Sequence, residues 1–593
     1  MVSRARTFRL RRLIRLRRLQ VEELGMQAEE GLERNVFKRL DHLSGVRRFV
    51  ASWLLLIGLL GAVVVAQINH LNVYYQSLEP APGGAYAEGI LGSFTNANPI
   101  YAQNPVDQAV SHLVFAGLFT YNRQNQLVGD LASSLAANSL GTVYTVHLRP
   151  HLMWQDGQPL TASDVVFTYH VIQNPDAQSP LYNSWQNVSV VAINPTTVTF
   201  TLANPLASFP HSLTTGIIPE HILGSVPMPA MRSVAFNTDT PVGAGPFSWA
   251  GLAVTDGATT TQQVQIALKP FAGYQGGKPL LDSFSIHTFN DQSSLIAAFK
   301  NHQINAMVGL NQLPASLDHD STIRSYDMPL TAAVMVFFRT TDGVLADKVV
   351  RQALVQAANT QAILHNLGYP TDPVVEPLLR NQLAFNPNDA QAGYDPAAAS
   401  ASLAADGWIG GKNGMRSKSG TPLAFKLYTA NTGEYQMVAN ELITQWRALG
   451  IDVQMVAQDS TSFQDTLAYH NYDAVLSGIS IGVDPDMFVY WDSTQADVRA
   501  PERLNFSEYS NATADESLEG GRTRLDPALR VIKYQAFLQQ WKQDTPALGL
   551  YQPRFLYIAS SPVFGLSEHT INNGTDRLDD VQNWEILQRR VSE

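Results

Sequence analysis

The sequence predicts an α/β fold of more than one domain that follows a membrane-spanning helix. The chain has 593 residues, more than one hydrophobic core usually serves, and a globular composition with 45% hydrophobic and 15% charged residues. Beyond residue 395, strand patterns alternate with helix patterns, which is typical of a parallel sheet covered by helices. Near the amino terminus, residues 49–68 form an apolar run without a single charge.

The apolar run Phe49–Ile68 can cross a bilayer, because a helix of 20 residues spans a hydrocarbon core of about 30 Å. Residues 1–48 carry 13 Lys/Arg and six Asp/Glu, a net charge of +7, which leaves −18 for the rest of a chain with −11 overall. By the positive-inside rule, we expect a single-pass protein of the cell membrane with a cytoplasmic amino terminus and a large part outside. Residues 69–84, which contain SLEPAPGG, are expected to be a tether.

Two other interpretations of the amino-terminal end are weaker. A cleaved signal peptide would have a shorter basic region and an apolar run of roughly 7–15 residues. The arginine-rich start could contact nucleic acid, but orientation of the helix and attraction to anionic lipid headgroups explain it adequately. We therefore expect the helix to be retained, and we expect no nucleic-acid partner.

The most informative local pattern is a strand, a turn and a capped helix in direct succession. Tyr144–Arg149 alternates apolar and polar residues, as in a strand with one buried face. The Asp-Gly pair at 156–157 predicts a turn, and Thr161 with Asp164 can cap a helix that ends at Pro175.

These residues resemble the family 5 extracellular solute-binding proteins, the oligopeptide, dipeptide and nickel receptors of bacterial ABC importers. Members carry a block of the form YTFHLRPGVKFHDGTPLTADDVVFSY, which residues 144–169 match without insertion. Residues 241–247 are similar to the family's PVGTGPY turn, and residues 350–359 to its VRQALAYAID helix. The resemblance implies a two-lobed periplasmic-binding-protein-like fold of class II, of the large type with an extra scaffold domain.

The resemblance also divides the chain. Lobe I is expected to comprise residues 85–119, 238–325 and 548–593, the extra scaffold domain residues 120–237, and lobe II residues 326–547. Within lobe II, the patterns predict strands at 425–428, 451–456 and 473–477, with helices at 434–449 and 462–469 between them.

Parallel sheets bind ligands beyond the carboxyl ends of their strands, where the following helices expose unpaired N–H groups. Two segments of lobe II fall there, Ala430–Gly433 and Gly478–Asp486, and the resemblance adds the loop after the first strand of lobe I. For Asp484 the competing role is to start a turn before Pro485, and for Trp491 it is ordinary core packing. The candidate ligand-binding residues are Ser93, Thr95, Asn96, Asn431, Ser480, Ile481, Asp484 and Trp491, with Ser480 and Ile481 contributing their backbone.

One of these positions departs from the family pattern. Peptide-binding members carry an aspartate where this chain has Ile481, and that aspartate pairs with the amino terminus of the peptide. A buried ammonium without a counter-ion is costly. Either Asp484 takes over the role, or the ligand lacks a free amine at that point.

Residue types that would support catalysis or metal binding are sparse. The chain has no cysteine, which also excludes a lipidated amino-terminal cysteine, and it contains no P-loop lysine motif and no H-E-x-x-H. His147 and His151 are four residues apart, but Pro150 and the strand pattern exclude a helical metal pair. We therefore expect a binding protein without catalytic residues, metal or cofactor.

The expected function is that of an extracytoplasmic solute-binding protein. The resemblance implies that two lobes close on a peptide and present it to the permease and ATPase subunits of an ABC importer. One alternative is an importer-independent receptor for signalling or adhesion, which the unusual anchor favours. Others are a binder of a non-peptide solute, such as an oligosaccharide or a nickel chelate, and an enzyme such as a peptidase.

Overall fold

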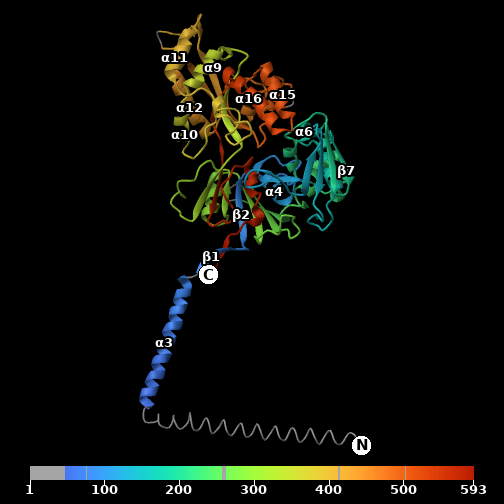
Figure 1. Ribbon diagram of the computed structural model, residues 1–593, viewed down its shortest axis with the longest axis vertical. Helices are drawn as coiled ribbons and strands as arrows, with labels where there is room; N and C mark the ends of the chain where they lie inside the picture. The colour runs from blue at the N-terminus through green and yellow to red at the C-terminus, as the bar shows by residue number, and fades with distance from the viewer. Residues whose placement is uncertain (1–46, 75, 257–261, 412–413, 501, 593) are drawn as a thin grey trace. The chain divides into compact units, whose positions relative to one another are not determined.

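The computed structural model describes residues 47–74, 76–256, 262–411, 414–500 and 502–592 (Figure 1). They fall into two compact units. One unit holds the amino-terminal helix and the carboxyl-terminal residues from Gln588, and the other is Pro80–Leu587. Most of the basic segment 1–48 lies outside the described residues.

The first unit is built around α3 (Arg47–Tyr74), a helix of 28 residues. Its stretch Phe49–Ile68 is long and apolar enough to cross a membrane, and it is not covered by other parts of the protein. The helix runs on to Tyr74, and β1 (Gln76–Ala81) then pairs with β23 (Leu587–Ser592). The segment expected as a tether therefore contains a strand whose partner lies more than 500 residues away, which local sequence patterns cannot reveal.

Lobe I contains a seven-stranded sheet in the order β13-β22-β12-β2-β11-β10-β9. The central strand β2 is parallel to β11 and β12, and the remaining neighbours are antiparallel. The strands and helices of this lobe are β2 (Ala85–Leu91), α4 (Pro105–Val114), β9 (Phe247–Asp256), β10 (Gln262–Pro270), β11 (Ser283–Phe289), α8 (Gln292–Lys300), β12 (Ala306–Val308), β13 (Ile323–Pro329) and β22 (Arg554–Ser560).

The scaffold domain is a four-stranded antiparallel sheet, in the order β5-β6-β8-β7, covered by α5. The predicted strand and capped helix are confirmed, because β6 pairs on both sides and Thr161 and Asp164 form a capping box on α5. The elements are β3 (Phe119–Tyr121), β4 (Leu127–Gly129), β5 (Ala132–Ala137), β6 (Val143–Leu148), α5 (Ala162–Gln173), α6 (Tyr182–Trp185), β7 (Val188–Asn194), β8 (Thr197–Leu202) and α7 (Glu220–Leu223).

The turn at residues 241–247 joins the scaffold domain to lobe I through two glycines. A Cβ on Gly243 would lie 1.9 Å from the carbonyl oxygen of Val114, and one on Gly245 would lie 2.7 Å from its carbonyl carbon. The glycines are therefore required by the close approach of two backbone segments at the end of α4.

Lobe II contains a five-stranded sheet in the order β19-β18-β20-β14-β21, in which β18 is parallel to β19 and β20. The alternation of strands and helices predicted after residue 395 is confirmed. The main elements are β14 (Ala332–Phe338), α9 (Lys348–Gln356), α10 (Thr360–Leu367), α11 (Pro396–Ala405), β18 (Ala424–Ala430), α12 (Gly433–Ala448), β19 (Asp452–Gln458), α13 (Ser460–Ala468), β20 (Ala474–Ser480), α14 (Phe488–Trp491), α15 (Ala512–Arg522), α16 (Pro527–Asp544) and β21 (Ala547–Tyr551), with the short strands β15 (Ile409–Gly410), β16 (Arg416–Lys418) and β17 (Thr421–Pro422) beside them.

The hydrophobic cores show which parts of Pro80–Leu587 pack together. One continuous core joins lobe I to the scaffold domain, running from Tyr86 and Trp584 to Trp154 and Phe200. Lobe II has two cores of its own, one on each face of its sheet, because alternate residues of β14 point to opposite sides. Lobe I and the scaffold domain thus form one body, and lobe II forms another.

Two segments of chain connect the bodies. The seven-stranded sheet extends to Pro329 and the five-stranded sheet begins at Ala332, so the first crossing is at residues 330–331. The second is at residues 552–553, between β21 and β22. The strand β13 belongs to the sheet of lobe I, and β21 belongs to the sheet of lobe II. Both crossings therefore lie a few residues beyond the expected boundaries at 325 and 547.

Candidate functional site

A groove between the two lobes begins beside the crossings. A cavity of about 290 Å³ is lined from lobe I by Leu310, Asn311 and Leu556, and from lobe II by Thr432 and Tyr435 among others. A second cavity of about 660 Å³ shares several of these residues and extends over α8 and α12. Small-molecule sites have volumes of about 300–1,000 Å³, so the groove has the size of a ligand site.

Strand ends of both lobes supply the walls of this groove. Leu310 and Asn311 follow the carboxyl end of β12, and Thr432 follows the carboxyl end of β18. Thr432 is the N-cap of α12, and its hydroxyl accepts a hydrogen bond from the N–H of Tyr435 at 3.3 Å. The first turn of α12 therefore lies at the groove, as the strand–helix alternation predicts.

Arg554 lies at the base of the groove and contacts both lobes. Its guanidinium is 3.9 Å from the ring centroid of Tyr369, in lobe II. Its Nη2 donates to the carbonyl of Asn311 at 3.0 Å, and its Nη1 pairs with Asp327, both in lobe I. Burial lowers the pKa of Arg554 to about 10, and the side chain still carries a positive charge at neutral pH.

Glu434 supplies a negative charge to the same groove. Its carboxylate accepts hydrogen bonds from the hydroxyls of Tyr551 at 2.7 Å and Tyr369 at 3.3 Å. Burial, followed by the charge of Glu434, raises the pKa of both tyrosines, and the same causes raise the pKa of Tyr435 to about 12. The groove thus offers neutral phenols, one cation and one carboxylate, which suit hydrogen bonding to a polar solute.

The loop after β2 uses most of its polar groups to hold α4. The backbone N–H and hydroxyl of Thr95 donate to Asp107 at 2.7 and 2.5 Å, and Asp107 lies in the first turn of α4. Asn96 is buried, and its side-chain oxygen accepts from the N–H of Asn98. Ser93 is exposed.

The candidates on lobe II lie at two neighbouring strand ends. Asn431 is exposed after β18, and its N–H donates to the carbonyl of Gln458. Ser480 is exposed at the end of β20, where its carbonyl accepts from the hydroxyl of Tyr490 at 2.5 Å. Ile481 is buried, and its N–H donates to the carbonyl of Thr331 in the first crossing.

The last two candidates are engaged within lobe II. The Asp484 carboxylate pairs with both terminal nitrogens of Arg530 at 2.8 and 2.6 Å, and it already has a cation. Trp491 is fully buried, with its ring packed against Phe337 and Trp541.

Comparison with known proteins identifies the family. Residues 126–499 match the sequence profile of the bacterial extracellular solute-binding proteins, family 5. The chain belongs to this family. Its members are binding proteins, so the expectations of a two-lobed α/β fold and of a protein without enzymatic activity are confirmed.

Individual relatives of this family 5 protein agree. The oligopeptide-binding protein AppA of Bacillus subtilis is 25% identical over 491 residues, which are 80% of this chain and 87% of AppA. Among solved structures, NikZ from Campylobacter jejuni in complex with Ni(L-His) has a TM-score of 0.70 and 25% identity, covering 84% of this chain and 99% of NikZ. CtaP from Listeria monocytogenes, a substrate-binding protein of an ABC transporter, has a TM-score of 0.73 and 23% identity over 85% of this chain and 99% of CtaP.

None of the eight sequence-based candidates is among the residues that line the two cavities of the groove in this family 5 protein, and most of the residues that do line them were not predicted. Glu434 and Tyr435 lie in the first turn of a helix that the sequence predicts, three and four residues after Asn431, so the same reasoning could have included them. Arg554 lies on β22, and Asn311 lies in the loop after β12. No residue pattern near either one predicts that it lines a groove.

Residues 478–482 of this family 5 protein, GISIG, have the G-x-S-x-G spacing of hydrolase nucleophiles. Ser480, however, is the last residue of β20, and no helix begins until α14 at Phe488. The strand-to-helix turn that exposes such a nucleophile is therefore missing at this point.

A further cavity of about 350 Å³ lies within lobe I and the scaffold domain. Its lining includes the ion pair of His112 and Asp579, whose Nε2 and Oδ1 atoms are 3.0 Å apart. Burial raises the pKa of two other lining residues, Asp130 and Asp576, to about 6.

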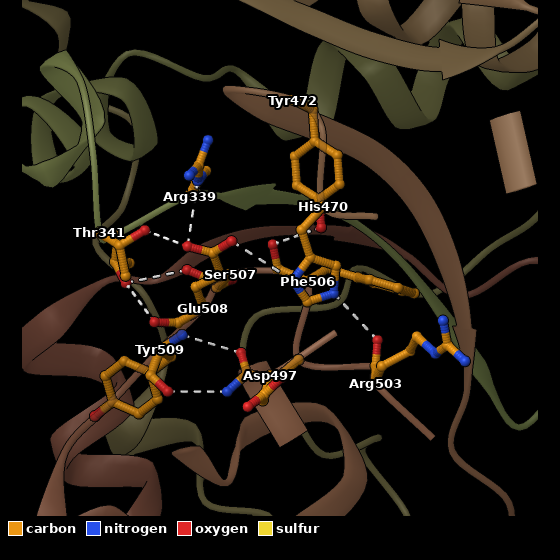
Figure 2. Close-up of polar contacts among 12 residues, drawn as sticks. Arg339, Thr341, His470, Tyr472, Asp497, Arg503, Phe506, Ser507, Glu508 and Tyr509 are labelled. Atoms are coloured by element: carbon orange, nitrogen blue, oxygen red, sulfur yellow. Dashed lines mark hydrogen bonds and ion pairs between the residues drawn. The ribbon is translucent and has the colours of Figure 1, made fainter. Parts of the chain in front are cut away.

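A polar cluster in lobe II involves His470, Glu508 and Arg339 (Figure 2). His470 Nε2 is 3.1 Å from the carbonyl oxygen of Arg503, and Nδ1 is 3.6 Å from Glu508. Glu508 also accepts hydrogen bonds from Arg339 and Thr341. None of these residues lines the groove, so the cluster is assigned to the stability of lobe II.

Proposed function

We propose that this protein is a membrane-anchored receptor that captures peptides in the groove between its lobes and delivers them to the permease of an ABC importer. The observation that carries this proposal is the groove itself, which is polar, of ligand size, and walled by strand ends of two bodies. Because the chain passes between the bodies at two short crossings, contacts of one ligand to both walls would favour closure.

A peptide suits the chemistry of the groove. Main-chain groups of a peptide need donors and acceptors, and the groove provides phenols, the Arg554 cation and the first turn of α12. The similarity to the oligopeptide-binding protein AppA supports the same ligand class. The similarity to NikZ, solved with Ni(L-His), supports a metal–amino acid chelate as a second candidate.

The proposed contacts are the exposed residues at the strand ends. Ser93 and Asn431 would contact the ligand through their side chains, and Ser480, exposed at the end of β20, through its backbone. Ile481 is buried and its N–H already bonds to Thr331, so its backbone would support the site from behind. Thr95, Asn96, Asp484 and Trp491, which are engaged or buried, would support the site from behind.

The amino terminus of the ligand is not held by Asp484 in this proposal. The carboxylate of Asp484 already pairs with Arg530, and Ile481 offers no charge. We infer that the ligand either lacks a free amine at this point or leaves its amine in solvent, because a buried unpaired ammonium is costly.

The anchor in this proposal is α3, with the amino terminus in the cytoplasm and the large part outside. Support comes from the uncovered apolar stretch Phe49–Ile68 and from the excess of Lys/Arg before it. An alkaline carbonate wash of membranes tests this, because a spanning helix keeps the protein in the pellet and a cleaved signal releases it.

Native mass spectrometry of the full chain, released from detergent micelles and purified without added ligand, tests the ligand class. Bound masses that fragment into peptides are the expected result. A nickel-containing mass would favour the second candidate, and a sugar would contradict both.

A further inference from the structure

The two bodies touch at a place that is distinct from the crossings. On the first body, Ala207 and Ser208 follow the scaffold strand β8 and precede the 3-10 helix Phe209–Thr214. On the second body, Asp486 and Arg522 lie before α14 and at the end of α15. Figure 1 shows the scaffold domain, with α6 and β7, next to α15.

Direct bonds join the bodies at this place. The hydroxyl of Ser208 donates to Oδ2 of Asp486 at 3.1 Å, and the N–H of Ala207 donates to the carbonyl of Arg522 at 2.8 Å. Beside them, a Cβ on Gly141 would lie 3.3 Å from the side chain of Leu525, so the scaffold backbone also packs closely on lobe II.

On the lobe II side of this contact, interactions within lobe II fix the position of the Asp486 carboxylate. Arg522 Nη2 is 3.3 Å from Asp486 Oδ2, and its guanidinium lies 4.1 Å from the ring centroid of Phe488. The N–H of Phe488 donates to Asp486 at 3.3 Å, and the N–H of Asp486 donates to Asp484 at 3.1 Å. The carboxylate is therefore a fixed acceptor, which lowers the entropy cost of forming the bond to Ser208.

The scaffold side is equally fixed. Phe209, the neighbour of Ser208, is buried among the rings of Tyr144, Trp185 and Phe200. The hydroxyl of Tyr144 donates to the carbonyl of Leu206 at 2.7 Å, which holds the chain directly before Ala207. Two rigid and complementary surfaces from separate bodies meet here.

We propose that Ala207, Ser208, Asp486 and Arg522 form an interlobe latch that stabilises the closed arrangement of the two bodies, in which the scaffold domain contacts lobe II. All four partners belong to the chain itself, so the latch acts whether or not a ligand is bound. It therefore sets the ratio of open to closed molecules, and through that ratio the apparent affinity for a ligand. This inference rests on the proposed capture in the groove, but its test needs no ligand.

The test measures the distance between the bodies in the full-length chain. Because the sequence has no cysteine, Ile193→Cys on β7 and Ile532→Cys on α16 give one dye on each body. Both isoleucines are highly exposed, at 63% and 62%, so labelling leaves the cores intact. Single-molecule energy transfer in detergent micelles then reports open and closed populations.

In this labelled chain, Ser208→Asp places a second carboxylate against Asp486 and is expected to move most molecules to the low-transfer state. Ser208→Ala, which removes one hydrogen bond to a charged group, is expected to raise the ratio of open to closed molecules about tenfold. The matched control is Ser233→Ala, because the Ser233 hydroxyl bonds to Ala230 within the scaffold domain. That variant should leave the distribution unchanged.

An unchanged distribution in Ser208→Asp, with a melting temperature like that of the parent, would overturn the latch. Bound peptides found by mass spectrometry in that same variant would leave the proposed function standing. The two failures are therefore distinguishable.

Discussion

Glu88 and Arg577 form an ion pair whose side chains are 0% and 2% exposed. Glu88 lies on β2, the middle strand of the lobe I sheet, and Arg577 lies 489 residues later. Arg577 also donates to the carbonyl of Gly574, and its guanidinium lies over the ring of Phe555, 5.5 Å from the centroid. The pair fastens the carboxyl-terminal segment to the core of lobe I.

Arg577→Met should destabilise the protein by about 3–5 kcal/mol, because it leaves the Glu88 carboxylate buried without a cation. Urea unfolding followed by tryptophan fluorescence measures the change. The control is Arg123→Met, since the pair of Arg123 and Asp580 is 41% and 31% exposed and should cost about 1 kcal/mol or less. Equal losses in the two variants would contradict the role given to burial.

Glu508 should stabilise lobe II at neutral pH and lose this effect in acid (Figure 2). Burial alone would raise its pKa, but the contact with His470, the hydrogen bond from Thr341 and the charge of Arg339 outweigh burial and lower it to about 2. Because the folded pKa lies below the ordinary value of 4.5, the contribution is complete above pH 4.5 and disappears as the pH falls toward 2.

Glu508→Gln should therefore cost about 2 kcal/mol at pH 7, the size of a hydrogen bond to a charged group, and progressively less below pH 4.5. Urea midpoints across this range provide the measurement. Glu516→Gln is the control, because Glu516 is 80% exposed and 3.5 Å from Lys533. A Glu508→Gln penalty that is constant with pH would show that the charge of Glu508 is not involved.

Asp130 should have the opposite pH dependence. Burial raises its pKa from 3.8 to about 6, despite the charge of His112 and a hydrogen bond from Tyr274. Between these values the folded protein binds a proton that the unfolded chain has lost, so stability falls as the pH rises from about 4 to 6. In the parent this decline can reach about 3 kcal/mol.

Asp130→Asn removes that decline. The free energy of unfolding of the variant minus that of the parent should therefore be larger at pH 7 than at pH 4. Urea midpoints at the two pH values test the difference. The exposed Asp318→Asn should leave the difference unchanged. A parallel response of Asp130→Asn and the parent would contradict the burial of a charged Asp130.

Sequence patterns predict those parts of this fold that depend on residues close together in the chain. The capping box of Thr161 and Asp164 and the strands on either side of α12 depend on residues within four positions of one another, so patterns predict them well. Family resemblance supplies the two lobes, which no local pattern could give.

The groove was only partly predictable, because its chemistry depends on distant partners. Asp484 follows the end of a parallel strand, as a ligand contact would, but its partner Arg530 is 46 residues away on α16. Arg554 reaches Tyr369 across the crossings, and nothing near Arg554 in the sequence indicates that contact. Strand ends could be located from the sequence, whereas the side chains that meet there could not.

Asn431→Trp should block capture while leaving the fold intact. Asn431 is exposed at the carboxyl end of β18 and precedes Thr432, which lines the groove, so an indole there would occupy space that a ligand needs. We expect at least about tenfold less co-purified ligand by native mass spectrometry, as when a ligand loses its central contacts.

The matched control is Lys426→Trp, which adds an equally large ring to an exposed position in the amino-terminal half of the same strand. Its ligand content should equal that of the parent, because parallel sheets bind ligands at the carboxyl ends of their strands. If Lys426→Trp loses ligand and Asn431→Trp keeps it, the ligand binds at the opposite edge of the lobe II sheet, and the groove has been assigned to the wrong face.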